Sequence, residues 1–539
     1  MISTSEILLP ITAVISYGLY QLAHLLYSKL TYPLRYIIGP KSPSIVFGNV
    51  KDLALTPKWR DEYGPIFRFA GLFSVPRLYT SDVKALSHVV ANFAIYQRAP
   101  MGQDFRRRVL GNGILSATFE DHKHQRQILD RAFGVGQVRL MTQVFVDKAV
   151  RLRDIWASQL AQEEKNGNGT RIDVFPWLRR VTLDVIGEAG FGYHFNALDA
   201  GVEGNALNDA FTELLHTPQA KRFAMFRLIQ MYIPILKLIP SFPGQKIVED
   251  ARKQMFAIAN GIVTESKSAI IQAGEGEKAL GIDDINSKND LLSVLLKANL
   301  STNIPESQRL SDEDLVAQIP AFLAAGHETT SHATSWALHA LSLNHAVQHK
   351  LREELLTMST DNPSMDQLNA LPYLEVVLRE VMRVYAPVWY LERIAMQDDV
   401  LPLSKPYIDK AGKTHETLPI PKGQIIHMPL AAVNTAKEIW GNDAEEFKPE
   451  RWENIPSATS GIPTVWANLM SFGAGTTNCI GFRFALTETK ALLFTLLRAF
   501  EFEPAASIGQ SGGALQGPVV LSEREKGTQL PLIVKLYNA

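Results

Sequence analysis

The chain has 539 residues, of which 46% are hydrophobic and 20% are charged, with 35 glycines and 29 prolines. This composition excludes general disorder and is typical of a globular chain that can bury a large core. The formal net charge of -1 argues against a nucleic-acid partner, and a single cysteine excludes a disulfide scaffold.

An uncharged apolar stretch runs from Ile7 to Tyr27 and is close to the roughly 20 residues that span a bilayer as a helix. A cleaved signal peptide is the alternative, but the stretch has no basic start and no small-residue cleavage site follows it. Lys29, Arg35 and Lys41 come after the stretch, so the positive-inside rule places the rest of the chain in the cytosol. We therefore expect residues 1–28 to form a single-pass membrane anchor.

A stiff segment follows, because Gly39, Pro40 and Pro43 break regular structure, and we expect residues 29–50 to form a hinge. The body, residues 51–539, begins with β-like runs at Ile66–Phe69 and Arg77–Thr80 and then becomes helical by periodicity. The sequence predicts one mainly α domain with small β-sheets.

Three polar or small-residue runs predict surface loops at Asn166–Thr170, Ala273–Asn289 and Ser507–Gly513. A further stretch, Phe223–Pro243, is apolar but carries three prolines, which prevent a continuous spanning helix. It either dips into the bilayer surface or forms a buried helix pair.

A long apolar helix is predicted from Ser311, whose side chain can cap it, to about Leu343. Within it, His327 and His332 superficially resemble the two histidines of a zinc protease. They are five residues apart rather than four, which sets them about 140° apart around a helix and excludes that zinc site.

Another helix is predicted from Pro372 to a point before Pro387, with one apolar stripe. Glu380 and Arg383 stand at i and i+3 on it and can form an ion pair. On an exposed surface, such a pair would contribute little to stability.

The only cysteine, Cys479, lies in a glycine-punctuated loop directly before a helical pattern from Phe482 to about Arg498. Glycines let a backbone approach a flat cofactor closely, and the start of a helix favours a thiolate over a thiol. Such a cysteine can ligate iron, although free cysteine is also commonly a small buried hydrophobe.

This loop resembles the heme-binding signature F-x-x-G-x-R-x-C-x-G of the cytochrome P-450 family, in which Thr477 replaces the arginine. The matching residues are Phe472, Gly475, Cys479 and Gly481. The resemblance extends from about Pro40 to about Lys535, and the chain looks like fungal microsomal members of the family. It implies the mainly α cytochrome P-450 fold with small β-sheets, heme b as cofactor, and Cys479 as the axial ligand of its iron.

Two more family patterns support the resemblance. Ala325-Gly-His-Glu328-Thr329-Thr resembles the oxygen-binding helix, which implies that the small residues leave room beside the iron and that Glu328 and Thr329 guide protons. Glu380 and Arg383, followed by Pro449-Glu-Arg451-Trp, resemble the charge network that locks the core behind the heme.

The family also has positive side chains that contact the heme propionates. His122 and Arg126 match one such segment and Arg393 matches another, so all three are expected to offset the charge missing at Thr477. An exposed helical charge pair is the alternative for His122 and Arg126.

The resemblance implies a monooxygenase that takes electrons from an NADPH-dependent flavoprotein reductase, with cytochrome b5 as a possible second donor. No dinucleotide fingerprint or P-loop is present in the chain, so electrons must come from outside. The expected location is the endoplasmic reticulum membrane, with a cytosolic catalytic domain.

By position, apolar residues are expected to line a pocket for a hydrophobic small molecule, which in the fungal members is often a terpenoid or another secondary metabolite. These residues are Phe322, Ala325, Val388, Trp389, Val519 and Val520. Ordinary core packing is the alternative for each. The alternatives for the whole chain are a heme-thiolate isomerase or dehydratase, a non-catalytic heme-binding sensor, and a structural membrane protein.

Overall fold

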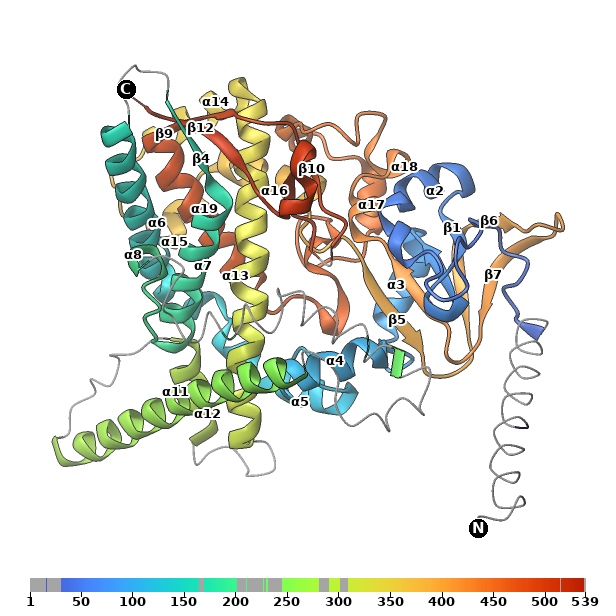
Figure 1. Cartoon of the computed structure of the whole chain (residues 1–539), viewed down its shortest axis with the longest axis horizontal. Coiled ribbons are helices and arrows are strands. Elements are labelled where there is room, and N and C mark those ends of the chain that lie inside the picture. Colours follow the sequence, from blue (N-terminus) through green and yellow to red (C-terminus); the bar gives the residue numbers. More distant parts are fainter. Residues whose placement is uncertain are drawn as a thin grey trace, which may run out of the picture. The chain divides into compact units, whose positions relative to one another are not determined.

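The computed structural model describes residues 31–163, 169–200, 245–280, 290–300, 309–513 and 515–537, together with a few isolated positions. The chain divides into two compact units, each shown in Figure 1. The smaller unit joins Met1–Gln97 to Glu392–Met428, and the larger unit joins Arg98–Leu391 to Pro429–Ala539. The predicted body from residue 51 therefore contributes to both units.

The smaller unit is built on a five-stranded sheet of order β1-β2-β8-β5-β3, in which β1 pairs antiparallel with β2 and β2 pairs parallel with β8. A second, two-stranded sheet pairs β6 with β7. The elements are η1 (Val50–Leu55), α2 (Thr56–Tyr63), β1 (Ile66–Ala70), η2 (Leu72–Ser74), β2 (Pro76–Thr80), α3 (Val83–Ala91), β3 (Tyr96–Arg98), β5 (Leu391–Ala395), β6 (Asp399–Ile408), β7 (Thr414–Ile420) and β8 (Ile425–Met428).

The larger unit is mostly helical. Its α-helices are α4 (Pro100–Leu110), α5 (Phe119–Ala132), α6 (Val135–Glu163), α7 (Val174–Phe191), α8 (Ala197–Ala200), α11 (Gln245–Leu280), α12 (Leu291–Leu300), α13 (Asp312–Leu343), α14 (His345–Leu356), α15 (Met365–Asn369), α16 (Pro372–Val384), α17 (Leu430–Asn434), α18 (Lys437–Trp440) and α19 (Phe482–Ala499). Shorter 3-10 helices are η5 (Pro449–Glu453), η6 (Ser457–Gly461), η7 (Met470–Phe472), η8 (Gly475–Thr477) and η9 (Leu521–Lys526).

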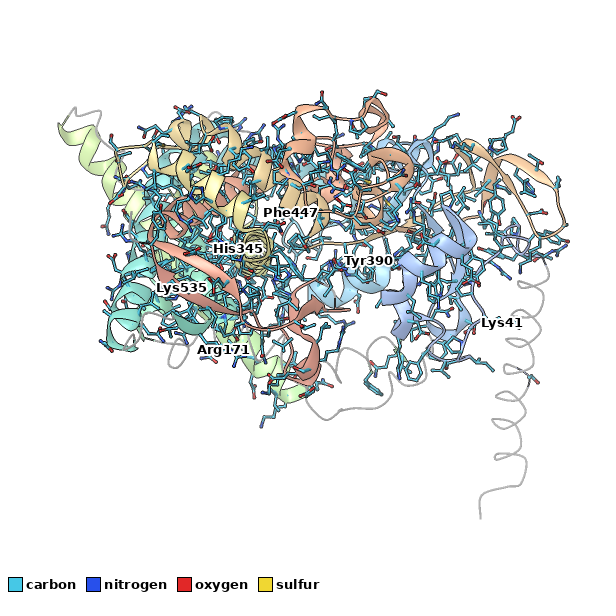
Figure 2. All side chains as sticks on the ribbon, turned by 90° about the horizontal axis from the view of Figure 1, so that it is seen from above. Lys41, Arg171, His345, Tyr390, Phe447 and Lys535 are labelled. Atoms are coloured by element: carbon cyan, nitrogen blue, oxygen red, sulfur yellow. The ribbon has the colours of Figure 1, made fainter. Side chains whose placement is uncertain are left out.

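Two small sheets complete the larger unit. One has the order β4-β12-β9 and the other pairs β10 with β11, all antiparallel. In the first, Arg171 lies opposite Ile533, and Figure 2 shows Arg171 and Lys535 on this sheet. The strands are β4 (Thr170–Asp173), β9 (Phe500–Pro504), β10 (Ile508–Gln510), β11 (Pro518–Val520) and β12 (Pro531–Leu536).

The core of the larger unit forms around α13, which runs through the unit with α7 and α19 packed beside it (Figure 1). The side chain of Ser311 caps its first turn by accepting a hydrogen bond from the backbone N–H of Asp314 at 3.0 Å. Most of its side chains are buried, which explains why its sequence is apolar nearly all round. A helix buried in this way is a rigid wall on which a site can be built.

Several predicted elements are confirmed, namely the strands at Ile66–Ala70 and Pro76–Thr80, the capped helix ending at Leu343, and the helix that begins at Pro372. Two predicted loops are wrong in part. The polar run from Ala273 continues α11 to Leu280, because its Ala, Glu, Lys and Leu residues favour helix, and Ser507–Gly513 contains strand β10, which pairs with β11.

No helix among the described residues is both long and apolar enough to cross a bilayer. The predicted anchor at Ile7–Tyr27 lies outside the described residues except for Ser16, and the apolar segment Phe223–Pro243 lies almost wholly outside them.

Candidate functional site

The loop that carries Cys479 is folded tightly before α19. The backbone N–H of Cys479 donates to the carbonyl of Phe472 at 2.8 Å, and this bond closes the segment between the two residues. Gly473 and Gly475 make this possible, because both have positive φ values, of 69° and 67°. Gly481 is the N-cap residue of α19, so Cys479 lies two residues before the cap.

Cys479 projects into a cavity of about 490 Å³ inside the larger unit. Cys479 is exposed, and because it lines this cavity, that exposure is to the interior space. The walls come from α4, α5, α7, α13, α16, α19 and the loops between them, and apolar side chains dominate. A cavity of this size and character is suited to a flat organic cofactor or a hydrophobic ligand.

The protonation of Cys479 differs from the sequence-based expectation. Burial raises the pKa of its thiol, while the hydrogen bond from the N–H of Gly481 and the positive charge of Arg126 act in the opposite direction. The protein alone therefore favours the thiol, and the start of the helix does not reverse this. A bound cation would favour the thiolate, because coordination removes the proton from a thiol.

One wall of the cavity is a turn of α13 that contains Ala325, Gly326 and Thr329. An added Cβ on Gly326 would lie 3.1 Å from atoms of Ile186, so the glycine also allows α7 to pack closely. The hydroxyl of Thr329 donates to the carbonyl of Ala325 at 2.6 Å. The small pair and the hydroxyl predicted from the sequence thus lie together at the cavity.

Glu328 is buried but is not among the residues that line the cavity. Its carboxylate accepts a hydrogen bond from Nη2 of Arg179 on α7 at 2.7 Å and lies 3.4 Å from Nε2 of His327. The side chain is therefore held toward α7, on a different face of α13 from Thr329. A direct role for Glu328 at the cavity requires it to leave this ion pair.

His122 and Arg126 occupy successive turns of α5, and both line the cavity. The guanidinium of Arg126 also binds the cysteine loop, donating to the backbone carbonyl of Asn478 at 2.6 Å and to its side-chain oxygen at 2.7 Å. Its Nε donates to Asp130 at 2.7 Å. Arg126 therefore fixes the loop before Cys479 as well as facing the cavity.

The remaining predicted site residues lie in several places. Phe322, Val388, Phe472 and Gly481 line the cavity, whereas Gly475, Trp389, Val519 and Val520 do not. The indole N–H of Trp389 donates to the carbonyl of Gly513, and both valines are buried in strand β11. Contact of these three side chains with a substrate stays a prediction. Arg393 is on β5 in the smaller unit, where it donates to the carbonyl of Glu392; its propionate contact remains a prediction.

The structure brings the predicted charge network together in the interior. Arg383 and Glu380 are both fully buried and joined by two hydrogen bonds, at 2.9 and 2.8 Å. Nε of Arg451 lies 3.4 Å from the same carboxylate, and the indole of Trp452 donates to it at 3.1 Å. Arg451 also pairs with Asp443, and this contact lowers the pKa of Asp443 to about 2. The pair is internal, unlike a weak surface pair.

Sequence reasoning missed two arginines of the cavity wall, Arg98 and Arg106. It also missed Arg179, the partner of Glu328, and Phe133, which packs edge-on against Phe322. No local motif marks these residues. A cluster of three arginines at 106–108 was visible in the sequence, but only the fold shows which of them faces inward.

The residues of the cavity fit the expected heme. A thiol projects into the cavity from a loop that its glycines allow to turn tightly, the walls are apolar, and positive side chains line the same cavity. This donor set combines a soft sulfur ligand for iron with cations that can bind carboxylates.

Comparisons with known proteins agree with this chemistry. Residues 39–511 match the sequence model of the cytochrome P-450 family. The chain is 45% identical over 533 residues, 97% of its length and 96% of the relative's, to cytochrome P-450 monooxygenase 128 of Postia placenta. It is 46% identical over 518 residues, 94% of each chain, to monooxygenase 205 of the same fungus. A ganoderic acid synthetase of Ganoderma lucidum is 35% identical over 490 residues, 86% of this chain and 87% of that protein.

Proposed function

The chain belongs to the cytochrome P-450 family and is a heme-dependent monooxygenase of it, and on that premise we propose that it oxidises a hydrophobic secondary metabolite. The observation that carries the proposal is the lone Cys479, which projects into an apolar cavity against the Thr329 turn of α13. When bound there, thiolate-ligated heme supplies the cleavage of the O–O bond.

The chain's own residues bind the heme, orient the cysteine loop and keep water out of the cavity. Cys479 would bind the heme iron through its sulfur, and Arg126 holds the cysteine loop through Asn478. Phe133, Phe322 and neighbouring apolar residues keep water out of the cavity. The hydroxyl of Thr329 lies in position to pass a proton, and Glu328 is a buried acid one residue earlier.

The substrate class is inferred from the walls of the cavity and from the similar fungal proteins. The apolar lining favours a hydrophobic small molecule, with few polar groups to orient it. One similar protein is named a ganoderic acid synthetase, which directs the proposal toward fungal secondary metabolism. Terpenoids are therefore the first class to screen.

We further propose that electrons come from an NADPH-dependent flavoprotein reductase, with cytochrome b5 as a second donor. The proposal rests on the sequence, which has no dinucleotide fingerprint of its own. The apolar stretch Ile7–Tyr27 and the basic residues after it support a single-pass anchor in the endoplasmic reticulum membrane, with the catalytic body in the cytosol.

The first experiment is the absorbance spectrum of microsomes containing the chain after reduction with dithionite and addition of carbon monoxide. We expect a strongly red-shifted Soret band that is lost in Cys479→Ser and kept in Thr476→Ser, a control in the same loop. Absence of a heme band from well-folded wild type would refute the proposal. If the band is present, product formation that requires neither O2 nor reductase would favour an isomerase or dehydratase instead.

The membrane proposal has a separate test. Deleting residues 1–28 should move the chain from the membrane pellet to the supernatant after centrifugation at low detergent, without loss of the red-shifted band. A full-length chain that is found in the supernatant would refute the anchor and leave the activity proposal unaffected.

A further inference from the structure

The cavity has an unbalanced electrostatic character. Among the residues that the structure describes, the side chains of Arg98, Arg106, His122 and Arg126 line it, whereas no Asp or Glu does. Guanidinium groups bind carboxylates through paired hydrogen bonds, and in a largely apolar space this attraction is weakly screened. Positive charge without acidic residues in such a cavity indicates the place of an anionic ligand group.

Arg126 cannot be the main anchor for such a group. Its Nη1 and Nη2 donate to Asn478 and its Nε donates to Asp130. All three nitrogens are thus engaged within the protein, and the carboxylate of Asp130 offsets the charge. Any anion in the cavity has to compete with these bonds for Arg126.

Arg106 differs from Arg126 in two ways: most of its N–H groups are not engaged by described residues, and no described carboxylate offsets its charge. Its Nε donates to the carbonyl of Leu115 at 2.9 Å, and no other hydrogen bond from it occurs within the described part of the chain. A guanidinium has five N–H groups, so the four on its two terminal nitrogens are available. Burial lowers the pKa of Arg106, and no carboxylate acts against this shift. Arg106 is therefore a half-buried cation held by a neutral acceptor.

The carbonyl of Leu115, the neutral acceptor of Arg106, is held in place by further hydrogen bonds. The carbonyl of Leu115 also accepts a hydrogen bond from Nη1 of Arg98 at 3.0 Å, so two guanidinium groups meet at one oxygen. The adjacent N–H of Ile114 donates to Gln318 of α13 at 3.1 Å. One turn before Arg106 on α4, an added Cβ on Gly102 would lie 3.1 Å from Nη1 of Arg106, so the glycine leaves room for the guanidinium.

Two cations at one carbonyl repel each other, and an anion between or beside them removes this cost. The cysteine loop supplies no positive charge of its own at Thr477, where the family signature has arginine. We propose that Arg106 is the carboxylate-binding residue of this cavity and takes the place of the arginine missing at position 477. The ligand group is either a propionate of the heme or the carboxylate of an acidic hydrophobic substrate. The proposal rests on the proposed function.

The first arm of the test measures heme retention in the full-length holoprotein, as the rate of transfer to excess apomyoglobin followed at the Soret band. Arg106→Gln should lose heme about tenfold faster than wild type or more, because a charged hydrogen bond is lost. Arg107→Gln is the matched control, since Arg107 is the next residue, is exposed, and does not line the cavity.

Esterification of the heme propionates identifies the group that Arg106 binds. In wild type, heme dimethyl ester should dissociate faster than heme, whereas in Arg106→Gln the two should dissociate at similar rates. Such non-additivity is the signature of a direct contact. If Arg106→Gln does not accumulate as folded protein, Arg106→Lys replaces it, with an ester effect smaller than in wild type because a point charge replaces the planar fork.

The second arm uses dodecanoic acid and 1-dodecanol as probes, titrated by the absorbance change of the Soret band. A substrate-binding role predicts unchanged heme retention, about tenfold weaker binding of the acid in Arg106→Gln, and unchanged binding of the alcohol. The inference is overturned if wild type has a normal carbon-monoxide band but neither heme retention, the ester effect nor acid binding depends on residue 106. That result would leave the proposed function intact.

Discussion

The hydroxyl of Thr329 has a single backbone partner, the carbonyl of Ala325, and its side chain lines the cavity. A hydroxyl can both donate and accept, so it can pass a proton and return to its backbone bond. Thr334, five residues further along the buried helix, makes the same kind of bond to the carbonyl of Thr330 but does not line the cavity. Comparing Thr329 with Thr334 therefore distinguishes the chemical role of the hydroxyl at the cavity from its role in helix packing.

Thr329→Val should lower the ratio of product formed to NADPH consumed by about tenfold or more, because it removes a positioned proton-transfer group and keeps the shape. Thr334→Val should leave this ratio unchanged. Both ratios are measured with a substrate found by screening, together with the heme content of each variant. Equal ratios in the two variants would place proton delivery elsewhere.

His339 is a buried residue of α13 whose ring packs edge-on against the stacked rings of Trp336 and Tyr385. Burial lowers its pKa from 6.5 to about 4, so the folded protein holds it neutral. The unfolded chain binds the proton more readily between these values. Stability is therefore lost as the pH falls from about 6.5 to about 4, which is opposite in sign to a histidine that gains an acidic partner.

His339→Phe should remove this part of the acid sensitivity. Between pH 7 and pH 4 the wild type should lose about 3 kcal/mol more unfolding free energy than the variant, the equivalent of this pKa shift. The measurement is urea unfolding at both pH values. Parallel losses in the two proteins would mean that His339 is solvated or paired in solution.

At the scale of elements, the network around Glu380 joins α16 to η5 and to the segment before it. The carboxylate accepts from Arg383, Trp452 and the backbone N–H of Lys448. Arg383 in turn donates to the carbonyls of Asn434, Ala444 and Glu446. One buried carboxylate and its arginine thus hold together three segments that are distant in sequence. All three precede the cysteine loop in the chain.

Glu380→Gln should destabilise the protein by about 3–5 kcal/mol, because Arg383 would be left fully buried without its compensating charge, whereas Arg451 keeps Asp443. The exposed pair of Asp104 and Arg108 on α4 provides the control, and Asp104→Asn should cost less than about 1 kcal/mol. Thermal unfolding of both variants measures the difference. A small effect of Glu380→Gln would mean that water enters the network.

At the scale of the whole molecule, the larger unit is built around a space that its own side chains leave open. A ligand that binds only the folded state adds stability that grows with the logarithm of its concentration relative to Kd, to about 4 kcal/mol at 1,000 times its Kd. Heme can add stability in two ways, by filling apolar space and by bonding to Cys479.

Reconstitution of the apoprotein with iron-free protoporphyrin IX should separate these contributions. In wild type we expect the unfolding temperature to rise with protoporphyrin and to rise further with heme. In Cys479→Ser, the further rise should disappear. Scanning calorimetry of the four complexes measures it. An equal effect of the two ligands in wild type would contradict ligation by Cys479.

Local sequence patterns were sufficient to predict the elements that carry a capping residue or a regular apolar stripe. The cap at Ser311 and the apolar run behind it predicted α13, and the apolar stripe after Pro372 predicted α16. Loops were less predictable, since pairing between β10 and β11 turned a Gly- and Ser-rich run into a sheet edge. Strand pairing depends on a partner that the local sequence does not contain.

The sequence by itself determined the chemistry: one cysteine in a glycine-punctuated loop, a small pair followed by Glu328 and Thr329, and the residues of a charge network. Those features are set by residue type and short spacing, which folding does not alter. Only the tertiary structure decided that Glu328 is held by Arg179 and that Arg106, rather than Arg107, faces the cavity. Such contacts join segments far apart in the chain, and their direction depends on how the helices pack.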